Sequence, residues 1–291
     1  MQRIATILTC HNRKAKTLAC LDALFQSHLP EGYSFEVFLV DDGSKDGTGD
    51  AVKQQFPDVH LIEGDGSLYW NGGMRVAFAA AMEQDFDYYL WLNDDTTLYG
   101  NALYTLLDTA QAIARSQGRE VIVVGTTQAQ QGGISTYGGL IRTSRWRPLK
   151  FSLVPPSDVP VACDTMNGNC ALIPGIIANR IGNLDEAFVH AMGDIDYGLR
   201  ACKAGYPIMV MPGYAGICMG NSIDNTHADT SLSCSKRWKK IISQKELPLK
   251  AWYALTKRHA GILWLPYFLW PYLKLAISPT TTKKTSNESK Q

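Results

Sequence analysis

The amino-acid sequence predicts an α/β fold in which a mostly parallel central sheet is flanked by helices, followed by a helical C-terminal extension. Up to about residue 125, short apolar runs alternate with segments whose apolar residues recur at helical spacing. This alternation is typical of parallel sheets with helices on both faces. Hydrophobic residues make up 45% of the 291 residues, which is enough for a sizeable core.

The individual elements follow from these patterns in chain order. Strands are expected at the apolar runs 3–9, 35–40, 59–62, 88–92, 121–124 and 208–211, and regular structure is expected to return at 169–173. Helices are expected around residues 18–25, 51–56, 74–82, 103–113 and 194–202, the last of them ending at Gly205. The stretch 132–160 is richer in Gly, Pro and Ser and predicts a hairpin with loops.

Charge and cysteine usage exclude several classes of protein. Lys and Arg number 28 against 27 for Asp and Glu, so nucleic acid is not an expected partner. The seven cysteines include no CxxC pair, which favours a reduced compartment over a disulfide framework. The first apolar run is too short for a signal peptide, and a cytoplasmic location is expected.

Acidic pairs follow two of the expected strands. Asp41 and Asp42 follow the run 35–40, and Asp94 and Asp95 follow the run 88–92. The carboxyl ends of parallel strands meet at one edge, where α/β sheets bind ligands. A divalent cation such as Mg²⁺ could bridge Asp94 or Asp95 to substrate phosphates. The alternative is that these acids form turns and helix caps.

Known phosphate and calcium motifs are missing. The turn after the first strand contains no glycine, which excludes a dinucleotide-binding fingerprint, and there is no phosphate loop of the GxxxxGK type. The segment that starts at Asp42 begins like a calcium loop but has Lys53 where a bidentate Glu is required.

A glycine-rich segment at residues 64–75 leads into an expected helix. Its glycines allow close backbone approach to a ligand, and a helix amino end beside Arg75 favours a diphosphate. The residues expected to contact the donor are Gly66, Trp70, Asn71, Gly73 and Arg75. The alternative is a flexible loop whose Tyr69 and Trp70 pack down on the protein.

Two further acids, Asp194 and Asp196, fall at the start of the helix expected from residue 194. The helix dipole favours an ionised carboxylate there, which is the state that a general base needs. An ordinary helix cap is the alternative.

Taken together, these segments resemble the family 2 inverting glycosyltransferases of the GT-A fold. The resemblance is closest to bacterial members that build surface polysaccharide, including rhamnosyltransferase-like ones. The resemblance covers roughly residues 3–215. The matching segments are Thr9–Arg13, Val40–Thr48, Asn93–Asp95 and Gly193–Arg200.

The resemblance implies roles for particular residues. Thr9, His11 and Arg13 would line the nucleotide pocket, and Asp41 or Asp42 would accept a hydrogen bond from the nucleotide base. Asn93 and Asp94 would contact the donor, and Asp95 would ligate Mg²⁺ or Mn²⁺ with help from Asp94. Asp194 would be the catalytic base that takes the acceptor proton.

Three positions depart from the family pattern. Asn93 replaces the first acid of the D-x-D element, Gly193 replaces the usual Glu so that Asp196 rivals Asp194 as the base, and residues 217–221 lack the expected histidine.

The implied reaction is the transfer of a sugar from a UDP- or dTDP-sugar to an acceptor hydroxyl, with inversion. The implied acceptor is a glycan, in particular a lipid-linked glycan of bacterial surface polysaccharide. A nucleotidyltransferase and a non-catalytic nucleotide-sugar-binding subunit are the alternatives.

The C-terminal region differs in character from the rest. The expected division is a catalytic domain at 1–220, a basic and aromatic helical extension at 221–278 and a disordered tail at 279–291. Basic residues beside Trp and Tyr predict peripheral contact with an anionic membrane, at the inner face of the plasma membrane. A helical lid, or a dimer contact in a homo-oligomer, is the alternative.

Overall fold

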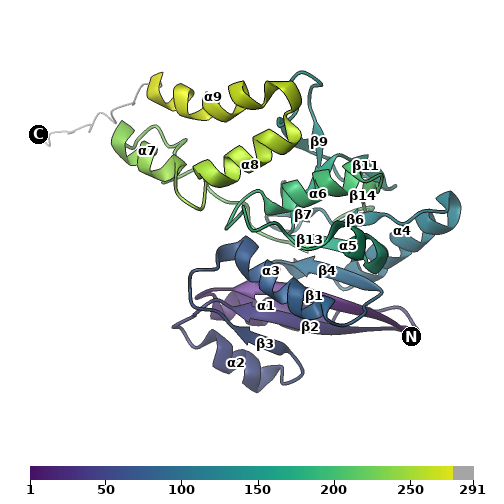
Figure 1. The fold of residues 1–291 in the computed structure, drawn as a ribbon. Helices are drawn as coiled ribbons and strands as arrows, with labels where there is room; N and C mark the ends of the chain where they lie inside the picture. The colour runs from purple at the N-terminus through teal and green to yellow at the C-terminus, as the bar shows by residue number, and fades with distance from the viewer. Residues whose placement is uncertain (278–291) are drawn as a thin grey trace, which may run out of the picture. The chain divides into compact units, whose positions relative to one another are not determined.

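The computed structural model describes residues 1–277 (Figure 1). The chain forms two compact units. The first is Met1–Gly220, and the second begins at Asn221.

The first unit is built on an eight-stranded sheet with the order β11-β14-β6-β13-β4-β1-β2-β3 (Figure 1). Its strands are β1 (Gln2–Cys10), β2 (Tyr33–Asp41), β3 (His60–Glu63), β4 (Tyr88–Leu92), β6 (Ile122–Val124), β11 (Val161–Cys163), β13 (Cys170–Pro174) and β14 (Ile208–Val210). Strands β3, β2, β1 and β4 are parallel. Strand β13 runs antiparallel to both β4 and β6, and β11 runs antiparallel to β14. The sheet is therefore mixed and largely parallel.

Two small sheets adjoin it. One contains β5 (Thr97–Leu98), β15 (Gly216–Ile217), β7 (Thr127–Gln128) and β8 (Ser135–Tyr137), and the other contains β10 (Phe151–Leu153), β9 (Gly139–Arg142) and β12 (Thr165–Met166). The hairpin expected in the stretch 132–160 is the antiparallel pair of β9 and β10.

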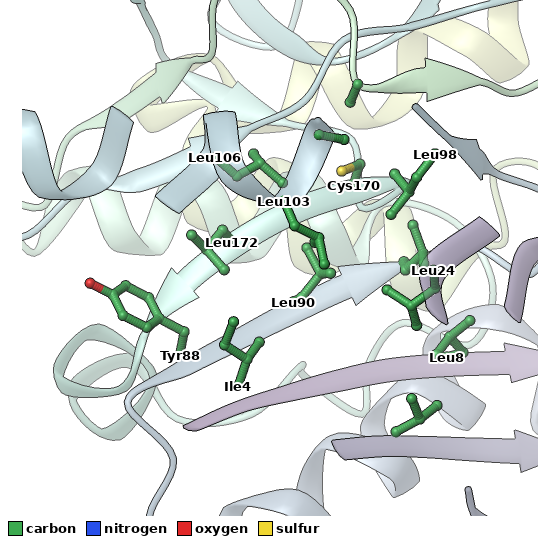
Figure 2. Packing of buried hydrophobic residues seen from close by; sticks show 14 of the residues in the cluster. Ile4, Leu8, Leu24, Tyr88, Leu90, Leu98, Leu103, Leu106, Cys170 and Leu172 are labelled. Carbon is green, nitrogen blue, oxygen red and sulfur yellow. The ribbon is translucent and has the colours of Figure 1, made fainter. Parts of the chain in front are cut away.

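Helices cover both faces of the large sheet. The helices of this unit are α1 (Lys14–Phe25), α2 (Thr48–Gln55), α3 (Tyr69–Met82), α4 (Ala102–Gln117), α5 (Gly175–Ile181) and α6 (Gly193–Lys203). One buried cluster joins the sheet to α1, α2 and α4, and the other joins it to α3, α5 and α6. Figure 2 shows part of the first cluster, in which Leu103 and Leu106 lie on the side of Leu172, and Leu24 lies on the side of Leu8. Burial of apolar surface on both faces fixes the strand ends that carry the acidic pairs.

One helix boundary differs clearly from the sequence expectation. Helix α3 begins at Tyr69 rather than at residue 74, so Gly72 and Gly73 lie inside the helix. A Cβ atom at Gly73 would overlap the Thr9 side chain. Gly73 therefore allows α3 to lie close against β1. In the sequence, a glycine needed for close packing looks the same as a glycine in a loop.

The second unit is helical. It contains α7 (Cys234–Ile241), α8 (Leu249–His259), a short 3₁₀ helix (Gly261–Leu263) and α9 (Trp264–Ile277). Among residues 1–277, no helix has the length and apolar character needed to cross a bilayer. The tail expected to be disordered, 279–291, lies outside the described residues.

Candidate active site

The carboxyl ends of three neighbouring strands bring most of the expected site residues to one edge of the sheet. His11 and Arg13 follow β1, Asp42 follows β2, and Asp94 and Asp95 follow β4. Cys10, the last residue of β1, pairs with Asp41, the last residue of β2. The structure therefore brings both acidic pairs to the same edge, as the sequence analysis predicts.

We call Asp41, the last residue of β2, and Asp42 the acidic pair after β2. This pair is held by backbone N–H groups. The two Asp42 carboxylate oxygens accept hydrogen bonds from the Gly66 N–H at 2.8 Å and the Tyr69 N–H at 3.0 Å. Asp41 accepts from the Ser44 N–H at 3.1 Å. Gly66 adopts a left-handed backbone with φ +89°, which a side chain would disfavour. Asp42 thus anchors the glycine-rich segment to the end of β2.

His11 completes this loop network. Its Nδ1 donates to the backbone carbonyl of Asp42, and its Nε2 accepts from the side-chain amide of Asn12 at 2.8 Å. The carbonyl cannot donate, so it fixes the proton on Nδ1. These two hydrogen bonds hold the His11 ring beside the backbone of Asp42.

The acidic pair after β4 is held by cationic side chains instead. Arg13 Nη1 lies 3.1 Å from Asp94 Oδ1 and 2.9 Å from Asp95 Oδ2, and Lys16 Nζ lies 3.7 Å from Asp95. Burial raises the pKa of Asp94 to about 6, although Arg13 acts in the opposite direction. Negative charge at this position is therefore only partly offset by the protein.

The residues present fit a hard divalent cation. Asp94 and Asp95 offer carboxylate oxygens, the donor type that Mg²⁺ and Mn²⁺ prefer. Within residues 1–277, no group of three or more His, Cys, Asp or Glu side chains is arranged to hold a metal. The remaining ligands would have to come from substrate phosphates and water, as is usual for Mg²⁺.

Trp70 contacts both Asn93, which precedes the acidic pair after β4, and Gly168, which precedes β13. Its Nε1 donates to Asn93 Oδ1 at 2.7 Å, and a Cβ atom at Gly168 would lie only 2.6 Å from its ring carbons. Asn93, which departs from the D-x-D pattern, thus uses its side-chain oxygen to position an indole ring.

The candidate bases Asp194 and Asp196 have different surroundings. Asp194 lies in the first turn of α6, where its carboxylate accepts from the Gly168 N–H at 3.0 Å and the Ile195 N–H at 2.8 Å. Burial raises its pKa. Asp196 is fully buried, and its carboxylate binds Arg200 Nε at 2.8 Å. Asp194 lies beside Gly168 and so beside Trp70, whereas Asp196 points toward Arg200.

The structure also explains why glycine stands before the candidate base. A Cβ atom at Gly193 would overlap Asn71 Oδ1. Asn71 is fully buried, and its Nδ2 donates to the carbonyl oxygens of Phe188, at 2.7 Å, and Asp185. The Asn71 side chain therefore fills the space in front of residue 193 and holds the segment that leads to α6.

Other expected donor contacts have protein partners. Thr9 is almost completely buried against Gly73. Arg75 lies on the second turn of α3, and its guanidinium is 3.6 Å from the Glu186 carboxylate. Arg13, rather than Arg75, is the arginine that reaches the acidic pair after β4.

Several site neighbours were not identified from the sequence. Lys16 and Thr17 on α1 reach Asp95 and Asp94, and Cys218 Sγ lies 3.5 Å from Asp95 Oδ1. Gly168 and Asn169 precede β13, and the Asn93 N–H donates to the Asn169 carbonyl at 3.1 Å. Site residues are expected after the carboxyl ends of parallel strands. Gly168 and Asn169 instead precede β13, which reaches the same edge with its amino end because it is antiparallel to its neighbours.

Three comparisons place this arrangement among known proteins. Residues 6–172, more than half of the chain, match glycosyl transferase family 2. Curated relatives described as N-acetylglucosaminyl-diphospho-decaprenol L-rhamnosyltransferases, from two strains of Mycobacterium tuberculosis, are 24% identical over 200 residues. That match covers 60% of this chain and spans 64% of the length of those relatives.

A solved structure shares the fold. It is a mannosyltransferase from Pyrobaculum calidifontis, in complex with GDP-Man and Mn²⁺. The similarity has a TM-score of 0.57 at 14% identity and covers 95% of this chain and 70% of that one. The expected GT-A-like fold is therefore confirmed, and the nucleotidyltransferase alternative is set aside. The chain belongs to glycosyl transferase family 2.

Proposed function

We propose that this protein transfers a sugar from a UDP- or dTDP-sugar to an acceptor hydroxyl, with inversion at the anomeric carbon. The observation that carries the proposal is a chain of contacts from Asn93 through Trp70 and Gly168 to Asp194. These contacts link a half-buried carboxylate with a raised pKa to Asn93, the residue that precedes the acidic pair after β4. A donor site and a base lying next to each other are what a direct displacement requires.

Each part of the site has a role in this reaction. Asp194 accepts the proton of the acceptor hydroxyl as that oxygen attacks the anomeric carbon. Its raised pKa makes it a stronger base than an exposed aspartate. Mg²⁺ or Mn²⁺ held by Asp95 and Asp94 would supply positive charge to the departing nucleoside diphosphate. Arg13, already within 3.1 Å of both acids, adds a cationic side chain at the same place.

We also propose the donor and acceptor classes. The curated relatives are named as L-rhamnosyltransferases of N-acetylglucosaminyl-diphospho-decaprenol, and the solved neighbour is in complex with GDP-Man and Mn²⁺. These descriptions support a nucleoside diphosphate sugar as donor and a lipid-linked glycan as acceptor for this chain, met at the cytoplasmic side of a bacterial membrane.

The first test of catalysis is Asp194→Asn. Turnover should fall by about 10²–10⁴-fold, because the amide cannot take the hydroxyl proton, while donor binding persists. Asp158→Asn, at an exposed acid, is the matched control and should keep full turnover. Asp196→Asn should lower stability more than turnover, since it breaks the ion pair with Arg200. Full turnover in Asp194→Asn would refute the assignment and reopen the non-catalytic alternative.

The donor is tested by thermal unfolding with UDP, dTDP or GDP, each with and without Mn²⁺. Binding to the folded state stabilises it by about 2.7 kcal/mol at a ligand concentration of one hundred times Kd. A selective shift with UDP or dTDP that needs Mn²⁺ is expected. A shift with GDP alone would contradict the donor class, and equal shifts with and without Mn²⁺ would contradict the metal.

A further inference from the structure

The two units of the chain carry opposite net charge. Residues 1–220 contain 16 Lys and Arg against 23 Asp and Glu, whereas residues 221–277 contain nine basic residues against three acidic ones. The last acidic residue before Ile277 is Glu246. Helices α8 and α9 therefore contain basic side chains, including Lys250, Lys257 and Lys274, and no carboxylate.

Helix α9 is fixed to the rest of its unit by one side. Tyr272 and Leu275 are buried, and the Tyr272 hydroxyl donates to the Leu247 carbonyl at 2.8 Å. The Trp252 Nε1 donates to the Phe268 carbonyl at 3.1 Å, and the rings of Tyr253 and Phe268 meet edge to face. These contacts hold α9 in one rotation about its own axis, so its other side is defined.

That other side is apolar and exposed. We call it the outer face of α9, and it comprises Ile262 of the preceding 3₁₀ helix with Leu265, Leu269, Trp270, Leu273 and Ile277. Their side chains are between 41% and 95% exposed, with Trp270 at 60%. At 3.6 residues per turn they span an arc of roughly 140°, a continuous apolar stripe. Large exposed patches of this kind mark interaction sites.

We propose that the outer face of α9 binds the surface of an anionic lipid bilayer, with the helix lying in the plane of the interface. A helix of 14 residues is about 21 Å long, shorter than the roughly 30 Å hydrocarbon core, and it contains Pro271 and Lys274. The part of α9 that the structure describes, up to Ile277, is therefore too short to cross a bilayer. An apolar stripe with an exposed tryptophan and basic neighbours suits the headgroup region instead.

Charge decides between a lipid surface and a second copy of the chain. A dimer formed through this face would bring together two units that each carry an excess of six positive charges. Anionic headgroups would offset the same charges, and each basic residue near such a surface contributes to binding. The inference does not depend on the proposed glycosyl transfer, because lipid binding is measured without donor or acceptor.

The test is flotation of the full chain with vesicles of phosphatidylcholine alone and with vesicles containing phosphatidylglycerol. The parent protein should float with the anionic vesicles, less with neutral ones, and less again at high salt. The double variant Trp270→Ser, Leu273→Ser should bind at least about tenfold more weakly, because two interfacial apolar side chains are lost. Trp146→Ser is the matched control, since Trp146 is 77% exposed in the first unit, and it should float like the parent.

Two results would overturn the proposal. One is equal flotation of the double variant and the Trp146→Ser control, which would place lipid binding elsewhere. The other is a fall in mass from dimer to monomer in the double variant, measured by light scattering, which would assign the outer face of α9 to a second copy. Unchanged far-ultraviolet circular dichroism shows that the double variant is folded.

Discussion

Two acidic pairs lie at the same edge of the sheet and are held in different ways. After β2, the carboxylates of Asp41 and Asp42 accept hydrogen bonds from backbone N–H groups. After β4, the carboxylates of Asp94 and Asp95 lie against the side chains of Arg13 and Lys16. In sequence the two pairs look alike, each lying just after an apolar run.

The difference indicates that the pair after β2 has a structural role, whereas the pair after β4 can exchange its cationic partners for a metal ion. Backbone donors are fixed by the chain, so Asp42 serves as an anchor for the glycine-rich segment. The side chains of Arg13 and Lys16 are 47% and 54% exposed, so both can move when a stronger cation arrives. The identity of the donors, more than the number of carboxylates, shows where a divalent ion can enter.

Among changes to the two acidic pairs, the largest expected effect comes from Asp95→Asn. If the pair after β4 receives the metal, turnover should fall at least about 100-fold, because the charge on the departing diphosphate is no longer offset. The Mn²⁺-dependent part of the thermal shift with nucleotide should also disappear. Steady-state kinetics and thermal unfolding measure the two effects. Unchanged Mn²⁺ dependence in this variant would remove the distinction between the pairs.

Asp94→Asn should increase the free energy of unfolding at neutral pH, and much less at pH 4. The folded-state pKa is raised from 3.8 to about 6, so the folded protein binds this proton more tightly than the unfolded chain. Stability contributed by Asp94 therefore falls as pH rises from about 4 to about 6 and stays low above it.

Removing the charge should recover on the order of 2–3 kcal/mol at pH 7 and less than about 1 kcal/mol at pH 4. Urea unfolding across that range, without divalent ions and with Asp158→Asn as the exposed control, measures it. A variant less stable than the parent at pH 7 would show that Arg13 fully compensates Asp94.

Asp42→Asn should act in the opposite direction. The amide keeps one acceptor oxygen, so either the Gly66 N–H or the Tyr69 N–H loses its partner. The free energy of unfolding should fall by about 1–3 kcal/mol, with weaker donor binding and an unchanged dependence on Mn²⁺. Urea unfolding and nucleotide titration test this. Stabilisation of the same size as in Asp94→Asn would mean that the two pairs are held alike.

The smallest expected effect is that of Trp70→Phe, which tests how the pair after β4 is joined to Asp194. A smaller aromatic ring replaces the indole, and the hydrogen bond to Asn93 at 2.7 Å is lost, a change of about 1 kcal/mol. KM for the donor should rise about fivefold while the protein remains folded. An unchanged KM would show that Asn93 does not depend on the indole for its position.

The arrangement of the acidic pairs could be predicted because it depends on local pattern. An apolar run identifies each strand, and the parallel topology of β2, β1 and β4 brings the residues after β2 and β4 to one edge. The fold class and the family follow from the same pieces. The assignments of Asp194, Asp95 and the donor-binding residues remain predictions that the variants above test.

The features that could not be predicted from the sequence depend on contacts between residues far apart in the chain. Gly193 is explained by Asn71, 122 positions earlier, and Arg75 is engaged by Glu186 across the chain. The early start of α3 depends on the closeness of Gly73 to Thr9. Gly168 escaped notice because it precedes an antiparallel strand, whereas the strand-end rule considers only residues that follow parallel ones.

The reversed strand β13 also has a consequence for the order of folding during synthesis. Strand β4, Tyr88–Leu92, is wholly buried in the finished sheet between β1 and β13. The ribosome delivers β1 long before β4, but β13 emerges about eighty residues after it. Until then β4 is a bare apolar edge that can pair with other chains. A fragment ending near residue 165 is therefore expected to aggregate, and one ending after Pro174 to do so less.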